Sequence, residues 1–122
     1  MALRTSADIA SVAIPMIGRA RTESVLLMVA DHQQRVRRVV TVTTGGATGA
    51  LVPVRDVLSL VLRHDGIAFA LAHNHPSGTV EPSAADVAVT ARLREAATSI
   101  GLRFLDHVVI AGDTWRSVSA AS

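Results

Sequence analysis

The chain has 122 residues, of which 49% are hydrophobic, with no cysteine and a formal net charge of +2. This length predicts one domain with a buried core and excludes a barrel enzyme, which needs about twice as many residues. The lack of cysteine excludes disulfides, thiolate metal sites and cysteine nucleophiles, and it fits a reducing compartment. We find no signal-peptide core and no apolar run long enough to span a membrane, so we expect a cytoplasmic protein.

The basic isoelectric point of about 11.0 gives little support to nucleic-acid binding. All basic residues are arginine, so almost no group titrates between the pKa of histidine and the pKa of arginine. A small positive net charge is therefore enough to raise the isoelectric point this far. The one basic cluster is Arg35, Arg37 and Arg38, which a strand would divide between its two faces. A solvated sheet edge and a phosphate or partner contact both remain open for it. Two Phe and one Trp form no platform for stacking bases.

The first half of the chain predicts a helix and then a β-hairpin. Ser6 is the expected N-cap of the helix, which runs to about Ile17 with Pro15 bending or ending it. Strands are expected over 24–29 and 35–43. After a glycine-rich loop, a second helix begins near Pro53 and carries an apolar stripe of Val54, Val57, Leu58, Val61 and Leu62.

The second half predicts three strands around a third helix. A buried strand is expected over 67–72, followed by a helix that Ser83 caps and that runs to Gly101. Two further strands are expected over 104–111 and 114–119. The order α-β-β-α-β-α-β-β predicts an α/β (α+β) domain, in which about three helices flank one mixed, curved sheet.

The pair of histidines after the third strand is the main indication of chemistry. His73 and His75 lie two residues apart, so in an extended chain both imidazoles point the same way. Asp86, at the start of the next helix, adds a carboxylate. Two imidazoles and one carboxylate form a three-point ligand set for a catalytic zinc and leave a fourth position for water. A single histidine would more often make an ordinary hydrogen bond, but the pair favours a metal.

Two carboxylates each have an ordinary alternative role. Ser83 and Asp86 form a Ser-x-x-Asp capping box, which explains Asp86 without any metal, although the upstream histidines favour ligation. A zinc site also needs a general base that is not a ligand. Glu23, at the entry to the first strand, is the best placed of the three glutamates, and its alternative is an exposed strand-end charge.

These residues resemble a known family. Glu23, His73-x-His75-Pro76 and Ser83-x-x-Asp86 resemble the JAMM signature of the JAB/MPN metalloproteases. The finer pattern resembles the bacterial RadC branch, and the similarity covers about Thr5 to Val118. Its motifs here are His73-Asn74-His75-Pro76-Ser77-Gly78, Glu81-Pro82-Ser83, Ala85-Asp86-Val87 and Leu105-Asp106-His107.

The resemblance implies a cytidine-deaminase-like JAB/MPN domain that hydrolyses peptide or isopeptide bonds with one zinc ion per chain. His73, His75 and Asp86 would hold the zinc, and Glu23 would be the general base for a zinc-activated water. Ser83 would stabilise the oxyanion in addition to its capping role. The implied partner is a peptide or protein substrate, with no membrane and with association between copies left open. Asp106 stays unassigned, and His107 is either a core histidine or a group near the metal.

Two other functions remain as alternatives. One is a non-catalytic protein-interaction module, which the intact set of motif residues argues against. The other is a DNA-repair-associated accessory protein of RadC type. Longer RadC proteins carry an N-terminal helix-hairpin-helix region that this sequence lacks, so we expect a single domain over residues 1–122 and little support for a DNA-linked role.

Overall fold

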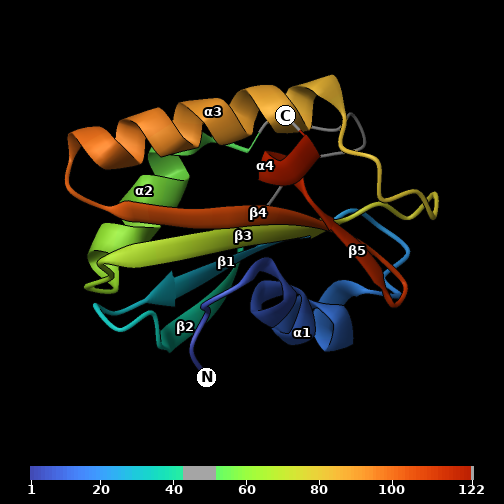
Figure 1. Ribbon diagram of the computed structural model, residues 1–122, viewed down its shortest axis with the longest axis horizontal. Helices are drawn as coiled ribbons and strands as arrows, with labels where there is room; N and C mark the ends of the chain where they lie inside the picture. The colour runs from blue at the N-terminus through green and yellow to red at the C-terminus, as the bar shows by residue number, and fades with distance from the viewer. Residues whose placement is uncertain (43–51, 122) are drawn as a thin grey trace.

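A computed structural model describes residues 1–42 and 52–121, which form a five-stranded sheet with helices on both faces (Figure 1). The strand order is β2-β1-β3-β4-β5. Only the β3–β4 pair is parallel, and the helix α3 connects these two strands. The predicted α+β domain with a mixed sheet is confirmed. The elements are α1 Ser6–Ile17, β1 Val25–Ala30, β2 Val36–Val42, α2 Val54–Arg63, β3 Ala68–Asn74, α3 Ala84–Ser99, β4 Arg103–Ala111, β5 Thr114–Ser117 and α4 Val118–Ala121.

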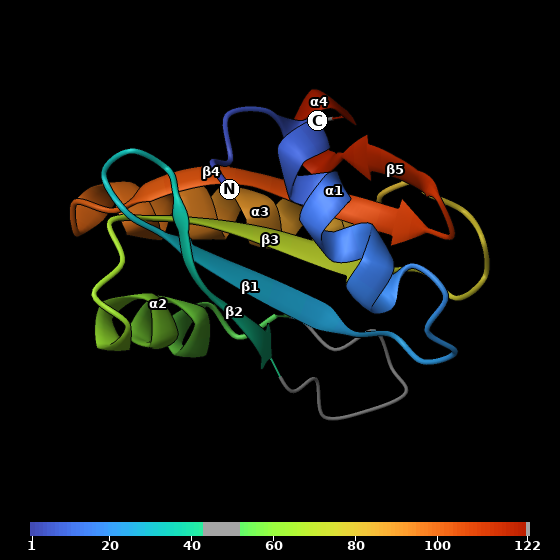
Figure 2. The same cartoon turned by 90° about the horizontal axis from the view of Figure 1, so that it is seen from below.

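Each face of the sheet has its own apolar core. Helix α1 covers one face, and α2 and α3 cover the other, as the two perpendicular views show (Figure 2). Successive side chains of β1 and β3 alternate between the two cores, and every residue of both strands is buried. Phe69 and Leu71 face α2 and α3, so His73, two residues further along β3, continues on that face.

The strand β4 contains a β-bulge that changes which face its residues occupy. Phe69 pairs with Phe104, but the next recorded pair is Leu71 with His107, so β4 has one extra residue at this point. In a regular strand Phe104 and His107 would point to opposite faces. The bulge turns both of them toward α3 and turns Asp106 toward α1, where it accepts a hydrogen bond from Ser6.

The start of α1 differs from the prediction. Thr5 is the N-cap, not Ser6, and it forms a capping box with Asp8. The hydroxyl of Ser6 instead donates to Asp106 at 2.5 Å, so a tertiary contact takes the residue that sequence favoured as the cap. Pro15 lies inside the helix, which continues to Ile17 because only one backbone hydrogen bond near the end is lost.

Other boundaries also shift. The strand β3 extends to Asn74, so His73 lies within the sheet, paired with Val25 and Val109, and not beyond its end. The last strand stops at Ser117, and the short helix α4 follows where a strand to residue 119 was expected. Leu62 of the predicted apolar stripe on α2 is 54% exposed.

The arginine cluster lies on a sheet edge, as one of its two interpretations predicted. The strand β2 is the outer strand beside β1, and Arg35, Arg37 and Arg38 are exposed. The predicted glycine-rich loop at 45–49 lies outside the described residues. Within the described parts of the chain, no helix has the length and apolar character needed to cross a membrane.

Candidate metal centre

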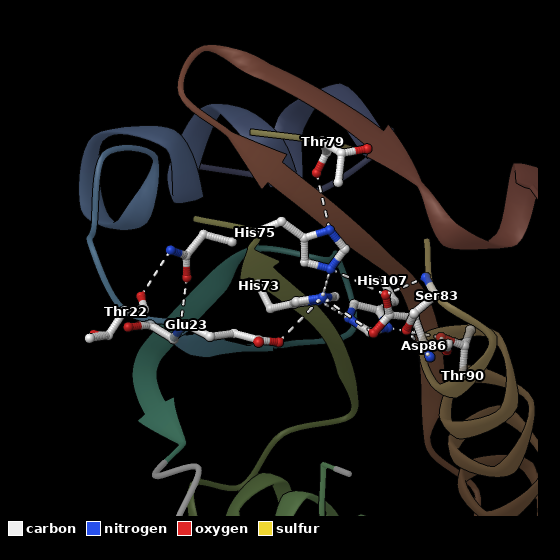
Figure 3. A network of polar contacts seen from close by, with 11 residues as sticks. Thr22, Glu23, His73, His75, Thr79, Ser83, Asp86, Thr90 and His107 are labelled. Atoms are coloured by element: carbon white, nitrogen blue, oxygen red, sulfur yellow. Dashed lines mark hydrogen bonds and ion pairs between the residues drawn. The ribbon is translucent and has the colours of Figure 1, made fainter. Parts of the chain in front are cut away.

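Three elements meet where β3 ends (Figure 3). The strand supplies His73, the residue directly after it is His75, the first turn of α3 supplies Asp86, and the segment before β1 supplies Glu23. Glu23 reaches this place because β1 runs antiparallel to β3, which sets the start of β1 beside the end of β3. The fold therefore brings together the four acidic and imidazole side chains that the sequence singled out.

The ligand-type atoms of His73, His75 and Asp86 converge on one point. The two Nε2 atoms lie 2.9 Å apart. Asp86 Oδ1 lies 3.3 Å from His73 Nε2, and Asp86 Oδ2 lies 3.4 Å from His75 Nε2. The side chain of His73 is 2% exposed and that of Asp86 is 14% exposed, so the three groups meet at the bottom of the site and not on an open surface.

Asp86 combines the two roles that the sequence left open. Its Oδ2 accepts a hydrogen bond from Ser83 N at 2.8 Å, while Ser83 Oγ accepts one from Asp86 N at 3.0 Å, so the predicted capping box is present. The same carboxylate faces both histidines. Burial alone would raise the pKa of Asp86, but the hydrogen bonds with His73 and Ser83 outweigh burial and hold that pKa far below 3.8. Asp86 is therefore ionised near neutral pH.

Glu23 lies on the other side of His73, with Oε1 3.9 Å from Nε2. Its side chain is 39% exposed, so solvent reaches it far more easily than Asp86. Together with His73 and His75 it forms a group whose ligand atoms all lie within 4.8 Å of one another, which is close enough to hold a metal ion. Because Asp86 is nearer to both imidazoles than Glu23 is to His73, the geometry favours Asp86 as the third ligand.

Asn74, between the two histidines, positions Glu23, a role that the sequence analysis did not find. Its Oδ1 accepts from Ser24 N at 2.6 Å, and its Nδ2 donates to Thr22 O at 3.0 Å and to Ala20 O at 3.3 Å. Asn74 is 1% exposed and faces away from the histidines. It therefore holds the segment on both sides of Glu23 from beneath.

His75 is held by the loop that follows it. Its Nδ1 lies 3.1 Å from the carbonyl oxygen of Thr79. A carbonyl can only accept a hydrogen bond, so Nδ1 carries the proton and, in the neutral ring, Nε2 presents its lone pair to the centre. The loop is also tied to β5 by an ion pair of Glu81 with Arg116, whose atoms are 2.6 Å apart.

His107 and Asp106 lie on opposite faces of β4. His107 is fully buried on the side of the centre, with Nε2 2.8 Å from His73 Nδ1 and Nδ1 2.8 Å from Thr90 Oγ1. Burial lowers the pKa of His107 to about 3. Asp106 lies under α1, where the hydroxyls of Ser6 and Ser117 donate to it. Of the two residues that the sequence left unassigned, His107 contacts the centre and Asp106 does not.

The layers of the fold and the histidine pair at the end of β3 are those of a JAB/MPN-type domain. A family profile described as RadC-like JAB domain matches residues 3–122. The chain therefore belongs to the RadC-like JAB domain family, as the motif resemblance predicted.

Two similar bacterial proteins are each named UPF0758 protein. The one from Bordetella bronchiseptica is 36% identical over 104 residues, which is 85% of this chain and 46% of the relative. The one from Chromobacterium violaceum is 41% identical over 96 residues, or 79% of this chain and 43% of the relative. The chain thus spans less than half the length of the curated relatives that it matches, and these relatives are bacterial.

Proposed function

We propose that this domain is a zinc-dependent metallohydrolase that cleaves peptide or isopeptide bonds. The observation that carries the proposal is the convergence of two imidazole nitrogens and one ionised carboxylate within 3.4 Å of one another. Lone pairs of two imidazole nitrogens and a carboxylate repel one another at this distance unless a cation, either a proton or a metal ion, lies among them, and a metal ion can bind all three groups at once. Membership of the RadC-like JAB family supports the same class of chemistry.

The donor set suits zinc. Two imidazole nitrogens and one carboxylate are a common protein ligand set for catalytic zinc, and the chain offers no thiolate that would favour a closed structural site. His73, His75 and Asp86 would hold the ion. Zinc bound there would lower the pKa of water and polarise a substrate carbonyl.

Glu23 is suited to moving the proton. Its carboxylate lies beside the ligand nitrogens without being the nearest acid to them, and its side chain is partly exposed, so water and substrate can reach it. A carboxylate in this position accepts a proton from the attacking water and delivers it to the amine that leaves. Asn74 keeps the segment that carries Glu23 at a fixed place.

Ser83 is suited to stabilising the oxyanion. Its oxygen accepts the capping hydrogen bond from Asp86 N through a lone pair, and that bond does not use the hydroxyl proton. This proton would be donated to the negatively charged oxygen of the tetrahedral intermediate. The proposed substrate is a peptide or a protein. A cytoplasmic location is also proposed, because a chain without cysteine suits a reducing compartment.

Zinc content tests the proposal first. Elemental analysis of protein purified without chelator should give one zinc per chain, lost in His75→Ala and kept in Glu23→Gln. His32→Ala is the matched control, because His32 is an exposed histidine in the β1–β2 turn at the far end of the strands from the centre. No zinc in the unaltered protein, even after incubation with the metal, would overturn the proposal and favour an interaction module.

A hydrolysis assay then tests the role of Glu23. Peptides and isopeptide-linked conjugates should be cleaved by the zinc-loaded protein, and Glu23→Gln should lower the rate about 10²–10⁴-fold at unchanged zinc content. Equal rates for Glu23→Gln and the unaltered protein would remove Glu23 from the mechanism.

A further inference from the structure

A chain of hydrogen bonds connects two of the proposed ligands through the interior of the domain. It runs from His73 Nδ1 to His107 Nε2 over 2.8 Å, and from His107 Nδ1 to Thr90 Oγ1 over 2.8 Å. From Thr90 Oγ1 it continues to the carbonyl oxygen of Asp86 over 2.7 Å. Figure 3 shows His107 between His73 and Thr90, which is a residue of α3. His107 and Thr90 are both buried.

The carbonyl oxygen of Asp86, at the end of this series of hydrogen bonds, sets the direction of each bond in the series. The carbonyl of Asp86 can only accept, so the single hydroxyl proton of Thr90 points to that carbonyl. The hydroxyl oxygen must then accept from His107, which places a proton on His107 Nδ1. A buried imidazole whose nitrogens contact a histidine and a threonine is neutral, so His107 Nε2 accepts, and the proton between the two rings belongs to His73 Nδ1.

We infer that His107 is a positioning residue of the metal centre, which fixes the proton of His73 on Nδ1 and thereby keeps Nε2 available to the metal. Free histidine prefers the opposite tautomer, with the proton on Nε2, where the metal must bind. His107 removes that preference and also fixes the orientation of the His73 ring. The inference rests on the proposed function, because it concerns the ligands of the same zinc site.

The β-bulge in β4 is what makes this role available. If β4 alternated regularly from Phe104 onward, with no bulge, the imidazole of His107 would point toward α1, away from His73. Thr90 lies one helical turn after Asp86, so its hydroxyl can donate its proton to the carbonyl oxygen of Asp86. The hydroxyl oxygen of Thr90 then faces His107 Nδ1. The ligand on the strand and the ligand on the helix are thus held in register by two buried residues.

Histidine ring nitrogens observed by long-range ¹H–¹⁵N NMR test the proton arrangement in metal-free protein near pH 8. We expect His73 Nδ1 and His107 Nδ1 to be protonated and His107 Nε2 to be unprotonated, whatever the state of His73 Nε2. An unprotonated His73 Nδ1, or a protonated His107 Nε2, would overturn the inference. The measurement needs neither metal nor substrate.

Zinc affinity, measured by competition with a chelator, tests the consequence. His107→Leu should weaken zinc binding about 10–100-fold. His107→Gln, whose side-chain oxygen can accept from His73 Nδ1, should recover most of the affinity. Thr90→Val should show a smaller loss and keeps the test open if His107→Leu does not fold. Val108→Ala is the matched control, because this neighbouring buried residue packs on the α1 side of the sheet. Equal affinities of His107→Leu and Val108→Ala would contradict the inference.

The two proposals can fail separately. A protein that binds one zinc but has an unprotonated His73 Nδ1 would retain the proposed function and lose this inference. A protein with the expected ring protons that binds no zinc would lose the proposed function, and with it the metal-positioning role of His107.

Discussion

Within residues 1–42 and 52–121, two helices begin with a capping box of the same design, and only one of these two boxes lies at the centre. At the start of α1, Thr5 Oγ1 accepts from Asp8 N, and Asp8 accepts from Thr5 N. At the start of α3, Ser83 and Asp86 make the same two bonds. The carboxylate of Asp86 faces two imidazoles, with Oδ1 toward His73 and Oδ2 toward His75. Asp8 is half-buried and accepts a second backbone bond, from Arg4.

The comparison teaches that the local motif sets the geometry of a carboxylate and the opposing strand sets its function. In both boxes hydrogen bonds lower the pKa of the aspartate. For Asp8 these bonds come mainly from the backbone of Arg4 and of Thr5. Both groups are therefore anions near neutral pH. Only the carboxylate placed opposite the end of β3 meets other ligand-type atoms.

The largest expected effect comes from Asp86→Asn. The amide keeps an oxygen that can accept from Ser83 N, so the cap is retained while the anionic ligand is lost. Zinc affinity should fall by more than the roughly 10–100-fold typical of a group outside the ligand set, and hydrolysis should become undetectable. Asp8→Asn, with the same chemical change in the other box, should leave both unchanged. Similar zinc affinities for the two variants would break the comparison.

A smaller effect is expected from Ser83→Ala. Loss of the N-cap should cost about 1 kcal/mol of folding free energy, and Thr5→Ala should cost a similar amount. If the Ser83 hydroxyl also donates to the oxyanion, kcat should fall about 10²–10³-fold in Ser83→Ala alone. Chemical unfolding and steady-state kinetics of the two variants separate these roles. A normal kcat for Ser83→Ala would leave this serine as a cap only.

Asn74→Ala tests how firmly the base must be held. The substitution leaves Ser24 N without its acceptor, a loss of about 1–3 kcal/mol in the free energy of unfolding for a buried group. We expect hydrolysis to fall while zinc content stays near one per chain, because the ligands remain on their elements. Loss of zinc together with activity would mean that Asn74 supports the ligands and not Glu23.

The smallest effect concerns Asp106, the buried carboxylate outside the centre. Burial opposes its ionisation, but hydrogen bonds from Ser117, Ser6 and the backbone of His107 outweigh burial and lower the pKa of Asp106 below 3.8. Asp106 therefore binds a proton more readily in the unfolded chain than in the folded protein. Its contribution to the free energy of unfolding is complete above pH 3.8 and is lost as the pH falls below that value. Unfolding of metal-free protein between pH 5 and 2.5 should show a weaker pH dependence in Asp106→Asn. An unchanged slope would contradict this.

Sequence patterns identified those parts of the centre that depend on local spacing. The i, i+2 pair of histidines at the end of an apolar strand and the Ser-x-x-Asp box each place their side chains by local geometry alone, so both were predictable. For Glu23 the sequence showed only that it was the best placed of the three glutamates, and the family resemblance implied a general-base role for it. Pairing of β1 with β3 brings Glu23 to the centre.

Features that depend on tertiary pairing could not be predicted. The bulge in β4 arises from its register with β3, and simple alternation along β4 would have placed His107 on the wrong face. Ser6 looked like a cap until Asp106, a hundred residues away in sequence, proved to be its partner. The hydrogen bonds of Asn74 join it to a loop fifty residues earlier, so nothing near it in the sequence indicated a role.

The ion pair between Glu81 and Arg116 has a consequence for ionic strength. Both side chains are largely exposed, at 69% and 47%, so dissolved salt screens their attraction and the pair contributes about 1 kcal/mol or less. The contacts among His73, His107 and Thr90 are buried, and salt barely reaches them. Added salt should therefore loosen the loop that borders the centre well before it disturbs the centre, so substrate access and metal retention should respond differently to the same buffer.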